Sequence, residues 1–354
     1  MNRINRYIRK HVLHGIGMVL LVFVGLDVVL SLIDQQSDLF GDYTFFDSVG
    51  MTLMTLPGRM DMHLPFVVLI GCLVGLGQMA ISSELTVMRA SGVSTARIVW
   101  MVSKPALAFA LIALLVGEFV SPDLDRYAQS RKTVLQWGSA GFMHEYGMWL
   151  RDGKQFANAN AVQPDGVLYG LSVYRMSDAW EIDSALQARR ATWQDDGYWL
   201  LEKVAITHFS GDSTSREWQP ELRWYSSITP DMLRILMLQP KQLSVRDLWY
   251  YSDYLQAQGL DGREYRLSFW IEGLKILAIA SLVLVAVSFI FGPLRSAPLG
   301  QRVFVGVIIG LVFNTLQHLL GPASMVFGFS PFLAVAVPIL VTAMIGTALL
   351  VRAR

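Results

Sequence analysis

The chain has 354 residues, of which 53% are hydrophobic and 16% are charged. Soluble domains carry roughly 25% charged residues, so this composition argues against an ordinary soluble domain and indicates a chain that lies largely in lipid. A formal net charge of +1 gives no reason to expect nucleic acid as a partner. The single cysteine, Cys72, excludes an intrachain disulfide framework.

Six apolar runs are long enough to cross a bilayer, which takes about 20 residues per helix. A basic segment, MNRINRYIRK, precedes the first run and no typical cleavage site follows it, so we interpret this run as a retained span and not as a signal peptide. Segment 45–62, broken by Pro57 and Gly58, either lies at the interface or extends the second span. The predicted spans are 14–33, 64–81, 98–120, 267–293, 303–320 and 329–351.

The basic residues of the short connections fall on one side of the predicted membrane. Cytoplasmic loops carry an excess of Lys and Arg, so both termini are predicted to be cytoplasmic. The loop between spans one and two, on the opposite side, carries five aspartates and one arginine, Arg59. The basic clusters are Arg3, Arg6, Arg9 and Lys10, then Arg89 and Arg97, then Arg295 and Arg302, and finally Arg352 and Arg354.

Residues 124–265 are predicted to form one large domain on the far side, between helical domains at 1–123 and 266–354. Stretches such as GVLYGLSVYRM alternate apolar and polar residues, and Asp196-Gly197 is a hairpin signal between strands that carry Trp193 and Trp199. This pattern predicts an antiparallel β-domain. The stretch that follows, TPDMLRILMLQPKQLSVRDLWYYSDYLQAQG, is predicted to be helical and to lead back to span four.

The cytoplasmic connection between spans two and three reads MAISSELTVMRASG. Ser82 and Ser83 are N-cap candidates, and Gly92 is placed to end a short helix. This helix is either a plain capped connector or a coupling helix that docks into a cytoplasmic ATPase, with Glu84 as its charged contact. In the second interpretation the candidate contacts are Ser83, Glu84, Leu85, Met88, Arg89 and Gly92.

The sequence holds no GxxxxGK[ST] phosphate loop, no GxSxG nucleophile and no His/Cys cluster with metal spacing. We therefore predict no catalytic residue and no metal ligand in this chain. Charges in or beside membrane spans are costly and indicate functional positions, although Glu272 and Lys275 could simply pair on one helix face. Basic residues at the outer side either hold lipid phosphates or extend to the interface. The lipid-binding candidates are Asp27, Arg59, Arg126, Arg131, Lys132, Arg263, Arg266, Glu272 and Lys275.

Several motifs resemble the LptF/LptG (YjgP/YjgQ) family of lipopolysaccharide export permeases over essentially the whole length. They are NRYI near the start, LGQMAISSELTVMRASG after span two, GEFVSP closing span three, GMWLRDGKQF in the β-domain and SFIFGPLRSAPLGQRV after span four. Two departures concern the lipid cavity. Some relatives place lysine where this chain has Ser31, and some place a basic residue near its Glu272.

The resemblance implies an α-helical membrane protein with six transmembrane helices in two groups of three and an inserted, β-jellyroll-like periplasmic domain. It implies a location in the inner membrane of a Gram-negative cell, pairing with LptF, docking of an LptB ATPase dimer on the coupling helix, and delivery of lipopolysaccharide to LptC and LptA. ATP and magnesium would then be used by the ATPase, and this chain would bind no cofactor. Two alternatives remain at this point: another ABC-type lipid or lipoprotein exporter, and a non-transporting membrane scaffold.

Overall fold

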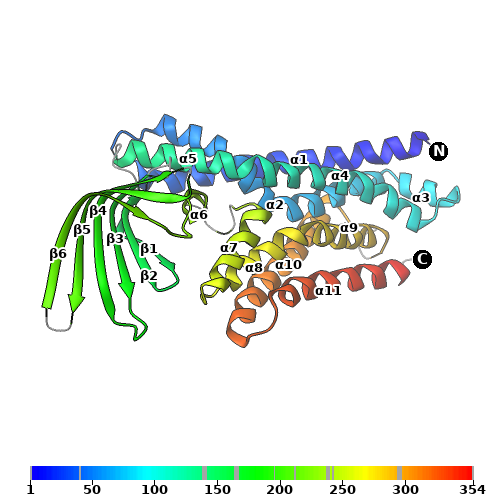
Figure 1. The fold of residues 1–354 in the computed structure, drawn as a ribbon. Helices are drawn as coiled ribbons and strands as arrows, with labels where there is room; N and C mark the ends of the chain where they lie inside the picture. The colour runs from blue at the N-terminus through cyan, green and yellow to red at the C-terminus, as the bar shows by residue number, and fades with distance from the viewer. Residues whose placement is uncertain are drawn as a thin grey trace.

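The computed structural model describes residues 2–39, 41–137, 142–162, 167–194, 196–210, 213–236, 240, 243–292 and 297–352. A helical bundle forms one part of the molecule and a curved antiparallel sheet forms the other, at the opposite end from both termini (Figure 1). The first half of the bundle contains α1 (Asn2–Asp34), η1 (Gln35–Asp38), α2 (Phe45–Ile81), α3 (Glu84–Ala90), α4 (Thr95–Phe119) and α5 (Ser121–Trp137). The second half contains α8 (Arg263–Gly273), α9 (Lys275–Phe291), α10 (Leu299–Phe327) and α11 (Pro331–Arg352).

The helices confirm the six predicted spans. Five helices of the described residues, α1, α2, α4, α10 and α11, are long and apolar enough to cross a membrane, and the pair α8 and α9 makes a sixth span with a bend of 49°. Segment 45–62 is the first half of α2, so it extends span two and does not lie flat at the interface. The helix begins with a capping box, in which Thr44 and Asp47 each bond the backbone N–H of the other.

Close helix packing in the bundle depends on a Gly71-x-x-x-Gly75 pattern in α2. A Cβ added at Gly71 would lie 2.6 Å from the Cα of Ile16 in α1, which is closer than real side chains pack. Small residues at this spacing let two membrane helices approach backbone to backbone. The fully buried Ile8, Val12 and Ile16 line the α1 side of this contact.

The sheet contains six strands in sequential order, each antiparallel to the next. This confirms the predicted antiparallel β-domain, and the pairing of Trp193 with Trp199 confirms the hairpin. The core lies on one face, where Trp199, Trp224 and Leu171 are buried. The strands are β1 (Phe142–Asp152), β2 (Gln155–Val162), β3 (Leu168–Met176), β4 (Ile182–Gln194), β5 (Tyr198–Ser210) and β6 (Ser213–Trp224).

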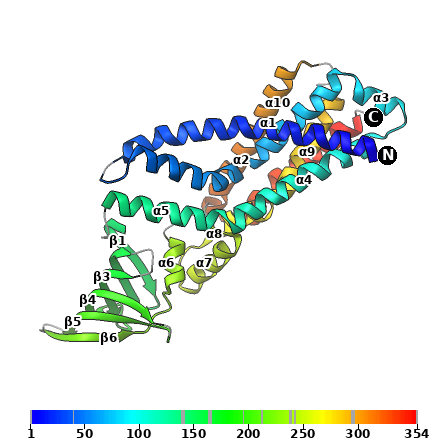
Figure 2. The same cartoon turned by 90° about the horizontal axis from the view of Figure 1, so that it is seen from above.

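Two short helices, α6 (Pro230–Leu236) and α7 (Val245–Ala257), lead the chain from the sheet back to the bundle, as predicted (Figure 2). The Tyr254 hydroxyl of α7 donates to the carbonyl of Arg151 at the end of β1, at 2.7 Å. The ring of Tyr251 lies 4.7 Å from that of Tyr265 in α8. These contacts join the sheet to the bundle. The predicted domain boundaries, after 123 and after 265, fall inside α5 and α8.

Candidate functional site

The short helix α3 lies at the end of the bundle that also holds both chain termini (Figures 1 and 2). Ser83 occupies the N-cap position of α3, as predicted, but its backbone is left-handed with φ 60° and its side chain makes no capping bond. An N-cap serine needs an extended backbone, and the tight turn from α2 does not allow one. The Ser82 hydroxyl instead bonds back to the carbonyls of Gln78 and Met79. Gly92, with φ +88°, follows the last turn and ends α3 as predicted.

One face of α3 packs on the bundle and the other is exposed. Leu85 is 3% exposed and belongs to the bundle core, against which Met88 also packs. Arg89 lies over the ring of Phe291 in α9, with its guanidinium carbon 5.6 Å from the ring centroid. The outer face presents Val87, which is 66% exposed. Leu85, Met88 and Arg89 therefore fix α3 to the bundle, and an external partner would meet the opposite face.

Glu84 is attached to the first helix. The Tyr7 hydroxyl of α1 donates to Oε1 of Glu84 at 2.9 Å. The second carboxylate oxygen, Oε2, has no hydrogen-bond partner within the described part of the chain. Glu84 therefore has one internal bond and one unbonded carboxylate oxygen, which is buried in the isolated chain.

A cavity of about 730 Å³ lies at the other end of the helical bundle, near the β-domain. It is lined by the outer half of α2, the end of α4, α5, the segment before α7, and the junction of α8 and α9. Apolar side chains such as Leu111, Leu114 and Met62 form part of its wall. Its charged lining consists of Arg59, Asp61, Glu118, Asp125, Lys132 and Glu272.

Lys275 is central to the charges beside this cavity. Its side chain is 6% exposed and its ammonium forms ion pairs with both Glu272 and Asp61. The pairing of Glu272 with Lys275, foreseen from their spacing, is confirmed, and it crosses the bend between α8 and α9. Asp61 was foreseen only as one acidic residue of the loop between spans one and two. It lies inside α2, which brings it to the ion pair.

Asp27 of α1 faces α2, in agreement with the expectation that it faces a neighbouring helix or water. Its carboxylate lies 3.1 Å from Nε of Arg59, and 3.8 Å from Nε2 of His63. Arg59 also donates to the Ser31 hydroxyl and, at 2.9 Å, to the carbonyl of Thr52. The guanidinium is thus held between α1 and α2.

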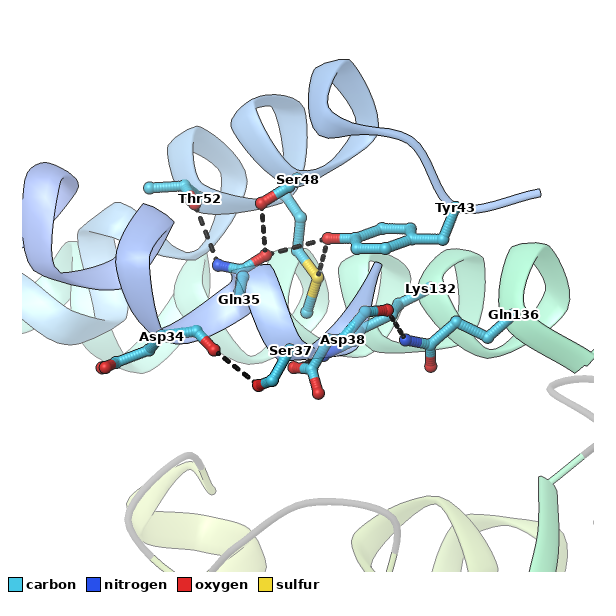
Figure 3. A network of polar contacts seen from close by, with 10 residues as sticks. Asp34, Gln35, Ser37, Asp38, Tyr43, Ser48, Thr52, Lys132 and Gln136 are labelled. Carbon is cyan, nitrogen blue, oxygen red and sulfur yellow. Dashed lines mark hydrogen bonds and ion pairs between the residues drawn. The ribbon is translucent and has the colours of Figure 1, made fainter. Parts of the chain in front are cut away.

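The basic candidates of the outer side fall into separate groups, each with internal partners. Lys132 of α5 bonds Asp38 at 2.7 Å beside a network centred on Gln35 (Figure 3). Arg131 lies 3.5 Å from Asp47. The remaining contacts are Arg126 to Asp247 at 2.7 Å, Arg263 to Asp261 at 2.8 Å, and Arg266 to the Ser252 hydroxyl at 3.2 Å and over the ring of Trp249. Hydrogen bonding from Arg263 lowers the pKa of Asp261 to about 2.

Sequence reasoning missed Asp125, which is 4% exposed and lines the cavity from α5. Burial raises the pKa of its carboxyl to about 6, although the nearby Arg59 lowers it. The helical spacing of Ser121, Asp125 and Ala128, all buried, is the signal that marks this inward face.

The whole-length arrangement of three spans, an inserted sheet and three further spans is matched by a known family. The model of the lipopolysaccharide export system permease LptF/LptG matches residues 6–352. The chain belongs to this family. It is 31% identical to the lipopolysaccharide export system permease protein LptG of Escherichia coli K12 over 338 residues, which cover 95% of this chain and 94% of the relative. It is 29% identical over 340 residues to the protein of the same name from Haemophilus influenzae, covering 96% and 95%.

Proposed function

We propose that this LptF/LptG-family chain is the LptG-type permease subunit of an ABC transporter that extracts lipopolysaccharide from the inner membrane and exports it toward the outer membrane. The observation that carries the proposal is the match to the permease family over residues 6–352. The relatives at 31% and 29% identity bear the LptG name, which favours this branch of the family over other lipid exporters and over a scaffold. The chain itself catalyses no covalent change.

The proposed orientation places the α3 end in the cytoplasm and the sheet in the periplasm. Basic residues of α1, α3 and α4 gather at the α3 end, and cytoplasmic ends of spans carry such an excess. The end of α11 lies at the same end of the bundle and adds Arg352. Arg295 and Arg354, which sequence analysis assigned to the same side, lie outside the described residues.

Each proposed partner has a separate role in the export system. A second permease, LptF, faces the membrane helices; an LptB ATPase dimer binds and hydrolyses ATP with magnesium; and LptC and LptA receive the lipid at the periplasmic side. No nucleic acid is involved. The exposed face of α3, which presents Val87, is the surface proposed for the ATPase, with Glu84 at its edge.

The proposed mechanism is mechanical. Closure of the ATPase dimer moves α3, and the core contacts of Leu85 and Met88 pass this movement to the bundle. The permease pair changes the shape of the space between its subunits and thereby its affinity for lipid. A transporter shifts an equilibrium only through such a difference in affinity between two states.

The test separates an ATPase contact of Glu84 from its internal bond. Glu84→Lys places a cation at a desolvated contact, and an unpaired charge there costs about 2–5 kcal/mol. We expect loss of ATPase copurification at unchanged membrane abundance. Tyr7→Phe is the matched control, because it removes the internal donor and leaves the carboxylate available.

Two outcomes would contradict the assignment of Glu84 to docking. One is that Glu84→Lys retains the ATPase. The other is that Tyr7→Phe loses it to the same degree, which would make the α1–α3 bond the decisive contact. The transport function is tested separately by ATP-dependent release of lipopolysaccharide from proteoliposomes that contain the purified complex.

A further inference from the structure

The cavity near the β-domain is lined by more acidic than basic side chains. Four carboxyl groups and two cationic groups face it. The two cations are already engaged, because Arg59 is paired with Asp27 and Lys132 with Asp38. A space with this lining favours a cationic group at its carboxylates.

Three of the four carboxyl groups have partners. Asp61 and Glu272 share the ammonium of Lys275, and Glu118 accepts a bond of 2.8 Å from the backbone N–H of Val245. Asp125 differs, because its side chain is 4% exposed and its Oδ1 has no hydrogen-bond partner among the described residues. A buried carboxylate without a partner is costly. A hydrogen-bond donor on a ligand would therefore stabilise the site most at this oxygen atom.

Two glycines make room for carboxyl groups at the cavity wall. A Cβ at Gly58 of α2 would lie 2.9 Å from Oδ2 of Asp125. A Cβ at Gly117 of α4 would lie 3.1 Å from Cγ of Asp61. The backbones of α2 and α4 thus approach these carboxylates more closely than a larger residue would allow. The two glycines therefore give the carboxyl groups their places in the cavity wall.

The cavity reaches the surface of the bundle through the outer end of α4. Leu111 and Leu115, which line it, are 48% and 49% exposed, and Phe119 at the end of the helix is 71% exposed. An apolar mouth beside an acidic interior suits a molecule with a cationic head and hydrocarbon chains.

The size and the chemistry of the site distinguish between cations. No group of three or more His, Cys, Asp or Glu side chains among the described residues is placed to hold a metal ion. A volume of about 730 Å³ also far exceeds a bare ion. A primary ammonium group carries three N–H donors, which suits the open acceptor on Asp125 and the neighbouring carboxylates.

We propose that this cavity binds the ammonium head group of a membrane aminophospholipid, with Asp125 as its acceptor and the acyl chains leaving past Leu111 and Leu115. The site is separate from α3, so it does not depend on the proposed ATPase contact. A structural lipid held here would fill the space between α2, α4 and α5.

The experiment compares two phospholipids that differ only in the head group. The full-length chain is purified from membranes in mild detergent, equilibrated with equal amounts of dioleoyl phosphatidylethanolamine and dioleoyl phosphatidylcholine, and analysed by native mass spectrometry. The trimethylated choline head lacks N–H donors. Because hydrogen bonds to charged groups are the strong ones, we expect a preference for the ethanolamine lipid of about tenfold.

Three variants test whether the preference for the ethanolamine lipid arises in this cavity. Asp125→Asn removes the acceptor charge and Leu115→Trp narrows the mouth without a change of charge, so both reduce the preference to within about twofold. Asp123→Asn, a carboxylate that is 79% exposed on the same helix, retains it. Elution profile and membrane abundance report folding of each variant.

Equal retention of the two lipids by the unmodified chain overturns the proposal, as does a preference that survives in Asp125→Asn. Displacement of the ethanolamine lipid by added magnesium chloride, reversed by chelator, would instead make this a cation site. Displacement by lipopolysaccharide at equal concentration would assign the cavity to the cargo and overturn the commitment to a membrane phospholipid.

Discussion

Replacing Lys275 by methionine tests whether this lysine is a structural ion-pair partner within the bundle. Its ammonium is shared by Asp61 and Glu272, whose side chains are 13% and 22% exposed. Methionine keeps most of the apolar stem but leaves two carboxylates unpaired, and removing one partner of a buried pair costs about 3–5 kcal/mol. We expect a lower thermal midpoint and lower membrane abundance. Fluorescence-detected size-exclusion chromatography after heating measures both.

A neutral triple variant gives the sharper result. Lys275→Met combined with Asp61→Asn and Glu272→Gln removes every charge of the group, so most of the lost stability returns. Lys154→Met is the control, because its partner Asp178 is fully exposed and such surface pairs contribute about 0–1 kcal/mol. The reasoning is refuted if Lys275→Met keeps the original midpoint, or if the triple variant is as unstable as the single one.

Three further predictions follow from burial, packing and topology. In phospholipid-depleted detergent at pH 8, Asp125→Asn raises the free energy of unfolding by up to ~3 kcal/mol, because burial raises the pKa of this carboxyl from 3.8 to about 6. The gain disappears below about pH 4, where the carboxyl is protonated in folded and unfolded chains alike, and thermal midpoints across pH check it; a gain that is independent of pH would contradict it. Gly71→Val lowers membrane abundance because α1 touches this backbone, whereas Gly25→Val, with open space around it, does not; equal abundance of the two would argue against the packing account. In intact spheroplasts, a cysteine at Asp196 reacts with an impermeant thiol reagent and one at Ser94 does not; comparable labelling would reverse the proposed orientation.

The spans and the β-domain could be predicted because their signals are local. A run of about 20 apolar residues or an alternating strand needs no knowledge of its neighbours. The strand faces were harder to predict. In β3 the buried positions are Leu168, Leu171 and Val173, because Gly170, with φ +61°, interrupts the alternation. A strict period of two from Leu168 would have placed Leu171 on the wrong face.

The candidate site was predictable only in part, because it depends on helix contacts. Glu272 and Lys275 are three residues apart, so their pairing could be read from the sequence. Their third partner, Asp61, could not, because it required knowing that α2 continues through segment 45–62. Asp125 lies in the charged run SPDLDRYAQSRK, whose composition resembles a solvated helix, yet α5 buries one face against α2.

The length of α2 has a mechanical consequence for any movement of α3. A helix of 37 residues is roughly 55 Å long, whereas the hydrocarbon core of a bilayer is about 30 Å thick. A tilt of about 10° around the helix midpoint displaces each end by roughly 5 Å, in opposite directions. Gly58 and Asp61 lie in the half of α2 farther from α3. Pro57 and Pro65 lie inside α2, and each removes a backbone hydrogen bond of the helix. A displacement at the α3 end is therefore divided between tilt of the whole helix, which moves the wall of the acidic cavity in the opposite direction, and bending at these two prolines.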